Sequence, residues 1–162
     1  MVFCNLHAKM MMKLTDILTP GSIKVPIEST EKTAVIKELV ELLGAEGLVK
    51  DTALLLDCVL ERERTRSTGI GQGLAVPHGK CAAVEKLIMA IGKPARPIDF
   101  DSKDGKPVNF VVLLASPPDQ TGPHIQALAR VSRLMLMEDF RSALSRAETA
   151  EDVYRIIEGF EK

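Results

Sequence analysis

Two segments in the first half of the chain carry apolar residues at the three-to-four-residue spacing of an amphipathic helix. Thr30 predicts the start of the first helix, which runs to about Glu46 and ends at Gly47. Asp51 is expected to cap the second helix, which continues to about Arg64. The expected buried positions of the two helices are Val35, Leu39, Leu42, Leu43, Leu55, Val59 and Leu60.

The same spacing predicts helices in the last third of the chain. A loop over residues 119–123 opens a helix, and Phe140 and Leu144 belong to one or two further helical turns. Thr149 and Asp152 have the spacing of a capping box and predict the start of the last helix. The positions expected to face inward are Ile125, Leu128, Val131 and Met135, then Val153, Ile156 and Ile157.

Other segments have the pattern of strands. Residues 23–27 alternate apolar and polar side chains, and Pro26, which has no N–H to donate, places this strand at a sheet edge. The almost wholly apolar Val108–Ala115 predicts a central strand covered on both faces. Leu87–Ile91 and the short Ile98–Phe100 are further expected strands. The fold class is therefore α/β, a three-layer sandwich in which helices flank a mixed sheet of about five strands.

The most unusual stretch is residues 68–80, which carries glycines at alternate positions. Gly69, Gly71 and Gly73 allow positive φ and close approach of another group. Pro77 stiffens the chain before His78, so we expect this histidine to be presented from a rigid strand end. The spacing matches neither a P-loop nor a dinucleotide fingerprint. A structural turn and a site for an anionic group remain equal alternatives on this pattern alone.

His124 adds a second candidate, in the first turn of a predicted helix. A helix N-terminus attracts anions and disfavours an imidazolium, so we expect His124 to stay neutral and donate a hydrogen bond. A capping or packing role is the alternative. Both His78 and His124 lie where a loop meets a regular element, and such junctions bind ligands in open α/β sheets.

Composition narrows the class of protein. The 162 residues favour one domain, with 46% apolar and 27% charged residues, and a net charge of −1 gives no basic excess for nucleic acid. No apolar run reaches the roughly 18 residues of a membrane span. Three cysteines without CxxC spacing disfavour a disulfide framework and favour a cytoplasmic protein. Cys81 follows His78 closely but makes a poor metal site, and Cys58 reads as a small core residue, so no metal is expected.

The chain begins with a segment that we expect to lie outside the domain. Met10, Met11 and Met12 follow one another, and the working chain is expected to begin near Met12. Residues 1–12, with Cys4 and His7, are therefore interpreted as an N-terminal extension, and residues 13–162 as the domain.

The glycine stretch carries a family resemblance. Ser-Thr-Gly-Ile-Gly-Gln-Gly-Leu-Ala-Val-Pro-His-Gly-Lys resembles the active-site signature of the type-2 (fructose/mannitol) EIIA domains of the bacterial phosphoenolpyruvate-dependent phosphotransferase system. Within that family it is most similar to the nitrogen-regulatory EIIA branch. The resemblance runs from about Met12 nearly to the end, through Leu60–Glu63, the Pro118–Thr121 loop with His124, and Thr149–Ile157.

The resemblance implies a role for each of several residues. His78 matches the histidine that the family phosphorylates, at Nε2, while His124 matches its second active-site histidine and Arg62 its active-site arginine. A guanidinium can hold two phosphoryl oxygens at once, and a neutral imidazole can donate to a third. Without the family, Arg62 reads as a solvated residue on a charged helix end. Backbone N–H groups around Ser67, Thr68 and Gly69 are further candidates for phosphate binding.

The function that the resemblance implies is a phosphoryl carrier without a cofactor. His78 is expected to accept phosphate from an HPr/NPr-like phosphocarrier and to pass it on or to signal through it. No EIIB-like domain is attached, which favours a regulatory target. Transfer to an EIIB in sugar uptake and a phosphorylation-blind binding module are the alternatives. Neither nucleic acid nor membrane insertion is expected. A handover between proteins requires that His78, His124 and Arg62 meet in one shallow, partly exposed depression.

Overall fold

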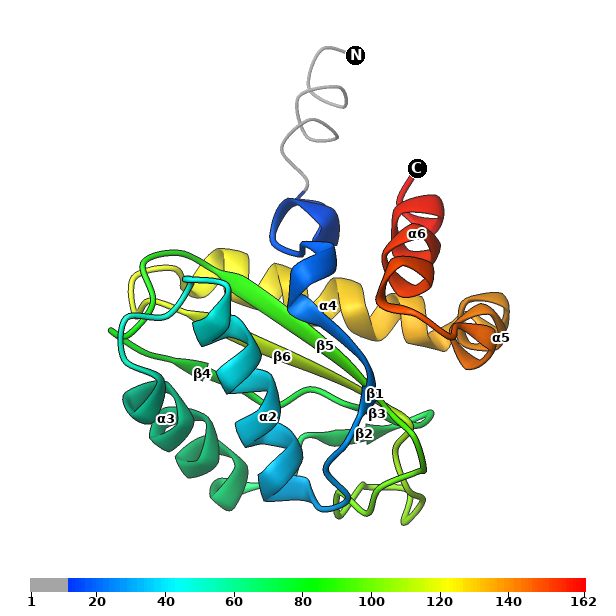
Figure 1. Cartoon of the computed structure of the whole chain (residues 1–162), viewed down its shortest axis with the longest axis horizontal. Helices are drawn as coiled ribbons and strands as arrows, with labels where there is room; N and C mark the ends of the chain where they lie inside the picture. The colour runs from blue at the N-terminus through cyan, green and yellow to red at the C-terminus, as the bar shows by residue number, and fades with distance from the viewer. Residues whose placement is uncertain (1–11) are drawn as a thin grey trace.

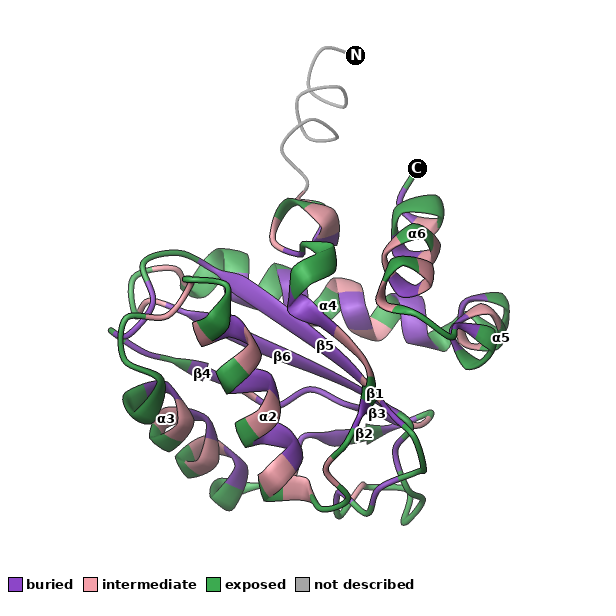
Figure 2. Ribbon diagram, in the orientation of Figure 1, coloured by how far each residue is buried: buried purple, intermediate pink, exposed green. Residues whose placement is uncertain are grey.

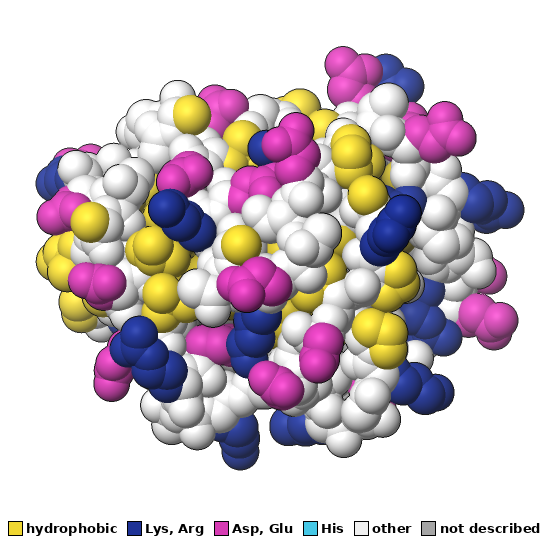
Figure 3. Space-filling model, turned by 60° about the horizontal axis from the view of Figure 1, so that its bottom comes forward, with side chains coloured by type: hydrophobic (Ala, Val, Ile, Leu, Met, Phe, Trp, Pro, Cys, Tyr) yellow, Lys and Arg dark blue, Asp and Glu magenta, His cyan; other side chains and the backbone are white. Residues whose placement is uncertain are grey.

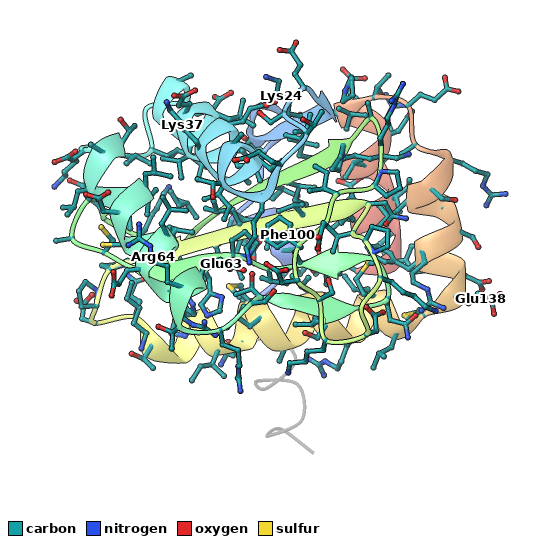
Figure 4. All side chains as sticks on the ribbon, turned by 90° about the horizontal axis from the view of Figure 1, so that it is seen from below. Lys24, Lys37, Glu63, Arg64, Phe100 and Glu138 are labelled. Carbon is teal, nitrogen blue, oxygen red and sulfur yellow. The ribbon has the colours of Figure 1, made fainter. Side chains whose placement is uncertain are left out.

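The computed structural model describes residues 12–162 and has three layers. Helices α2 and α3 cover one face of a central sheet and α4 covers the other, as Figure 1 and the view along the layers in Figure 4 show. Two short 3₁₀ turns, η1 (Leu14–Asp16) and η2 (Pro20–Ser22), precede the sheet. The strands are β1 (Ile23–Ile27), β2 (Gly69–Gly71), β3 (Leu74–Ala75), β4 (His78–Lys80), β5 (Ile88–Pro94) and β6 (Phe110–Ser116). The helices are α2 (Lys32–Ala45), α3 (Thr52–Thr65), α4 (Thr121–Leu136), α5 (Glu138–Arg146) and α6 (Ala150–Phe160).

Strand β6 is the centre of the sheet. The order of strands in the sheet is β1-β5-β6-β3-β2, and β4 also pairs with β6. Strand β5 runs antiparallel to β6, whereas β3 and β4 run parallel to it, so the sheet is mixed as expected. Strands β3 and β4 lie one after the other along the same edge of β6, at Phe110–Val111 and at Leu114–Ser116.

The strand predictions are confirmed for the regular part of the sheet and wrong elsewhere. Strand β1 is at the edge, and the apolar segment near residue 110 forms the central strand. Ile98–Phe100 is not a strand, because only an isolated bridge joins Ile98 to Val108. Three short strands, β2 to β4, lie within the glycine stretch, where the sequence predicted only a stiff end before His78.

The sheet separates two apolar clusters. Along β6, Val111, Leu113 and Ala115 pack with the residues of α2 and α3. Phe110, Val112 and Leu114 alternate with them and pack on the side of α4, α5 and α6. Figure 2 shows the resulting continuous buried surface along β5 and β6. This alternation decides which side chains at the end of β6 face α4.

Two of the predicted helix starts are confirmed. The Asp51 side chain accepts from Leu54 N at 3.0 Å, and Asp152 N donates to Thr149 Oγ1 at 3.1 Å. The Thr30 start is wrong. Helix α2 begins at Lys32 after Glu31, whose side chain makes no capping hydrogen bond.

The inward face of α4 differs from the prediction. Ile125 is 58% exposed, whereas the buried residues are His124, Ala127, Val131, Leu134 and Met135. Val131 and Met135 are buried as predicted and Leu128 packs partly buried against the core, so the prediction is wrong only at Ile125, where His124 takes the inward position. Burial of an imidazole in this stripe is the first sign that His124 belongs to a site.

The glycine stretch has the backbone freedom that its composition predicts. Gly71 and Gly73 adopt φ values of 98° and 74°, at the turn between β2 and β3. Gly69 has an extended backbone but no room for a side chain. A Cβ there would lie 2.9 Å from the Cα of Ser102.

The close contact at Gly69 predicts a measurable cost of substitution. Gly69→Ala should lower the free energy of unfolding by roughly 1–3 kcal/mol, because the backbone of residue 102 must move. Gly159→Ala is the matched control, since a Cβ there meets nothing within 4 Å inside α6, and it should raise stability by about 0.5 kcal/mol. Urea denaturation of both variants checks this. Equal effects of the two substitutions would contradict the packing described for residue 69.

Candidate functional site

His78 lies just after a break between two short strands, β3 and β4, that both pair with β6. Pro77 separates β3 from β4, and Leu114 N donates to the Pro77 carbonyl at 3.0 Å. His78 is then the first residue of β4 and pairs with Leu114. Its side chain therefore shares the α4 side of the sheet with Leu114, and it is half-buried. This agrees with the expectation of a histidine presented from a rigid strand end.

A hydrogen bond fixes the tautomer of His78. Its Nδ1 lies 2.8 Å from the carbonyl oxygen of Val76. A carbonyl oxygen only accepts, so Nδ1 carries the proton and donates it. The lone pair of the neutral ring is therefore on Nε2, at the opposite side of the imidazole.

His124 faces His78 from the first turns of α4. The two ring centroids are 5.4 Å apart and the ring planes meet at 60°. His124 is 3% exposed, and its Nδ1 lies 2.7 Å from the hydroxyl oxygen of Ser116, the last residue of β6. The sheet and the helix thus hold the two rings edge to face.

Both imidazoles are neutral at pH 7. Burial lowers the pKa of His78, and the charge of Arg62 acts in the same direction, against the hydrogen bond to Val76 and the charge of Glu63. Burial, with smaller contributions from His78 and Lys80, lowers the pKa of His124 to about 4. His124 is neutral as expected, and its burial is the largest cause.

Arg62 shares an open cleft with the two histidines. The cleft has a volume of about 500 Å³, and its lining residues come from α3, β4 and α4: Cys58, Glu61, Arg62, Thr65, His78, Gly79, Lys80, His124, Ile125 and Leu128. Arg62 Nη1 donates to the carbonyl of Arg66 at 3.0 Å, which holds the guanidinium near the end of α3. The structure therefore brings His78, His124 and Arg62 together in one partly exposed depression.

The backbone around Ser67, Thr68 and Gly69 is used differently from the expectation. Thr68 N donates to Glu63 Oε1 at 3.0 Å, and Gly69 N donates to Ser67 Oγ at 3.1 Å. None of these three residues lines the cleft. The N–H groups of Thr68 and Gly69 already have partners within the chain, so we leave the three residues out of the phosphate-binding proposal.

Glu63 instead ties the glycine stretch to two helices. Its buried carboxylate accepts from Thr68 Oγ1 at 2.6 Å and pairs with Lys32 Nζ of α2 at 2.8 Å. Lys32 also donates to the carbonyl of Phe100, and Figure 4 shows Glu63 and Phe100 next to each other beside the sheet. A buried carboxylate with three partners is stable in this position. It anchors the segment that leads to His78.

The sequence predicted three of the ten residues that line the cleft and missed the other seven, among them Lys80, Ile125 and Leu128. Lys80 lies two positions after His78 on β4, so the strand period predicts that it faces the same side. Its Nζ donates to Thr121 Oγ1 at 2.9 Å, at the start of α4. Ile125 was expected to face inward but is exposed and lines the cleft, whereas Leu128 packs partly buried against the core as expected and also lines the cleft. A helix stripe that includes His124 would have placed Ile125 there.

The cysteines do not form a metal centre with these histidines. Among residues 12–162, no group of three or more His, Cys, Asp or Glu side chains could hold a metal ion. Cys81 is buried, whereas Cys58 is half-buried and lines the cleft. Burial and the neighbouring Cys81 raise the pKa of the Cys58 thiol to about 11, so the Cys58 thiol is protonated at pH 7. Cys4 and His7 lie outside the described residues.

Two neutral imidazoles and a guanidinium line the open cleft of this α/β domain. Together they make the cleft suited to an anionic group. The family model described as "Phosphoenolpyruvate-dependent sugar phosphotransferase system, EIIA 2" matches residues 16–159. A nitrogen regulatory protein of Bradyrhizobium diazoefficiens is 33% identical over 90% of this chain and 95% of that protein. The chain belongs to this EIIA family, whose members are phosphoryl-carrying components of the phosphotransferase system.

The relatives fall into two groups. The fructose-specific EIIABC component of Bacillus subtilis is 38% identical over 93% of this chain, which spans only 24% of that longer protein. The crystal structure of the nitrogen regulatory protein IIA-Ntr from Neisseria meningitidis superimposes with a TM-score of 0.81 at 32% identity, covering 88% of this chain and 97% of that one. The chain thus resembles both sugar-specific and nitrogen-regulatory EIIA proteins. Within residues 12–162, no helix is long and apolar enough to cross a membrane.

The lowered pKa of His124 predicts a pH-dependent stability. Between pH 6.5 and about 4, the unfolded chain binds a proton on this ring that the folded protein does not. The stabilisation is therefore present above pH 6.5 and is lost as the pH falls towards 4. From pH 7 to pH 5, wild type should lose about 2 kcal/mol more unfolding free energy than His124→Gln, measured by urea denaturation. Equal losses would contradict a neutral, buried His124.

Proposed function

We propose that the protein is a phosphoryl carrier in which Nε2 of His78 accepts and returns the phosphoryl group. The observation that carries this proposal is the hydrogen bond from His78 Nδ1 to the Val76 carbonyl. It leaves Nε2 as the one nucleophilic nitrogen of a ring that lines an open cleft. Membership of the EIIA family supports the same role.

The transfer step needs no proton donor in the cleft. The lone pair of Nε2 forms a bond to phosphorus while the N–P bond of a protonated phosphohistidine on the donor breaks. The donor ring leaves as a neutral imidazole. His78 keeps its Nδ1 proton, and the phosphorylated ring becomes cationic. The Val76 carbonyl then accepts a charge-assisted, and hence stronger, hydrogen bond.

The neighbours of His78 provide groups for the phosphoryl oxygens. In phosphoryl transfer the charge is spread over three equatorial oxygens. The Arg62 guanidinium presents paired donors and the neutral His124 ring presents one more. Lys80 is a further cation at the edge of the cleft. We assign these groups to stabilising the charge during transfer.

A protein donor fits this cleft better than a small molecule. The cleft is open, and Ile125, which is 58% exposed, offers an apolar contact next to His78. On the face that Figure 3 shows, where no histidine is visible, acidic and basic side chains are interspersed without a large patch of one sign. We therefore propose an HPr/NPr-like phosphocarrier as donor, recognised by local contacts around His78.

The acceptor distinguishes two forms of this function. Likeness to nitrogen regulatory proteins over nearly their whole length favours a regulatory target that senses the state of His78. Likeness to a fructose-specific component supports phosphate transfer to an EIIB as the second candidate.

Pull-downs with wild type, His78→Ala and His78→Asp address the remaining alternative. Equal capture of the target by all three would favour a phosphorylation-blind binding module.

The phosphoryl acceptor can be identified by mass. Incubation with phosphoenolpyruvate, enzyme I and the phosphocarrier should add one acid-labile phosphoryl group to wild type and none to His78→Ala, because the Nε2 lone pair of His78 is the proposed acceptor. His7→Ala, outside the described residues, is the matched control and should label like wild type. Labelling that persists in His78→Ala would overturn the assignment.

The paired N–H donors of the Arg62 guanidinium predict that another positively charged side chain cannot replace this residue. Arg62→Lys should slow phosphoryl transfer to His78 about 10- to 100-fold, because a single ammonium cannot hold two oxygens at fixed geometry. Arg64→Lys is the control, since the Arg64 side chain is 71% exposed and pairs with Glu61 at the surface. Rapid-quench labelling measures both rates. An unchanged rate in Arg62→Lys would remove the guanidinium from the mechanism.

A further inference from the structure

The hydroxyl of Ser116 is hydrogen-bonded to the second histidine, His124. Ser116 ends β6, where Phe110, Val112 and Leu114 alternate on the α4 side, so its side chain continues that row towards α4. The residue is fully buried, at 0% exposed, and its Oγ lies 2.7 Å from Nδ1 of His124. It is behind His124 as seen from the cleft, whose lining does not include it.

The proton in this hydrogen bond can lie on either partner. Within residues 12–162, His124 Nδ1 is the only hydrogen-bond partner of Ser116 Oγ. If Nδ1 donated, the hydroxyl proton would be buried without an acceptor, which is unfavourable. If the hydroxyl donates, both groups are satisfied and the proton of the neutral imidazole lies on Nε2.

We propose that Ser116 is a positioning residue that holds His124 as its Nε2–H tautomer, so that the ring donates to the phosphoryl group on His78. This inference rests on the proposed function. The other tautomer would present a lone pair to the phosphoryl oxygens and repel them. The 5.4 Å between the ring centroids places His124 next to the reacting ring.

A hydroxyl at position 116 suits a carrier that must release its phosphoryl group again. A carboxylate at this position would favour the imidazolium, whose full charge would hold a phosphoryl group more strongly. A hydroxyl orients the ring and leaves it neutral. The resulting neutral donor assists the transfer in both directions.

The tautomer can be observed directly. Long-range ¹H–¹⁵N spectra of the unphosphorylated protein should show His124 protonated at Nε2 in wild type. Ser116→Ala should populate the Nδ1–H form, and Ser116→Thr, which restores a hydroxyl, should return the ring to Nε2–H. Ser145→Ala, which removes an exposed hydroxyl bonded to Ser142 O on α5, should leave the His124 signals unchanged.

The rate of phosphoryl transfer gives the second measurement. Ser116→Ala should slow labelling of His78 about tenfold, and Ser116→Thr should recover most of that loss. A wild-type His124 protonated at Nδ1, or an unchanged rate in Ser116→Ala, would overturn the inference. If wild type is not phosphorylated at all, the proposed function fails, while the spectra still decide the tautomer.

Discussion

The hydrogen bond between the ring of His78 and the carbonyl of Val76 depends on how the chain runs along the central strand. Strands β3 and β4 follow the same edge of β6, and Pro77 interrupts them without changing the register. The interruption brings the Val76 carbonyl to 2.8 Å from Nδ1 of a residue only two positions later. The pairing of the chain with the central strand thereby sets the tautomer of the His78 ring.

The rest of the cleft balances charge around a ring that must be neutral before the transfer and cationic after it. Burial and the nearby Arg62 lower the pKa of His78, which keeps the lone pair available. The charge of Glu63, whose carboxylate also anchors the glycine stretch through Thr68, raises the same pKa. A carrier needs such a balance, because a cleft that bound the phosphoryl group too strongly would not release it.

Much of the fold could be predicted because the spacing of apolar residues along the chain indicates which side chains are buried. The edge position of β1, the central β6 and the Asp51 cap all follow from local patterns. The pattern failed where a polar residue is buried. His124 occupies the inward position at the start of α4, so Ile125 was assigned to the core instead of the cleft, whereas Val131 and Met135 are buried as expected. The prediction of a strand at Ile98–Phe100 was wrong for another reason, since a bridge between only two residues leaves no periodic signal in the sequence.

The candidate site was predictable in its principal residues and not in its supporting contacts. The motif around His78, with Arg62 and His124, pointed to one cleft, and the structure brings the three side chains there. The amides of Thr68 and Gly69 were expected to face an anion, but a carboxylate and a hydroxyl close in sequence bind them. Ser116 had no signal of its own, because its importance depends on a helix that packs against the strand end. Such contacts follow from the tertiary structure alone.

The most direct test of the account is to identify which nitrogen of His78 carries phosphorus. One-bond ³¹P–¹⁵N couplings in the phosphorylated, ¹⁵N-histidine-labelled protein report this without assumptions about partners. We expect phosphorus on Nε2 and a proton retained on Nδ1, because the Val76 carbonyl holds that proton. Phosphorus on Nδ1, which would require the bond to Val76 to break, would contradict it.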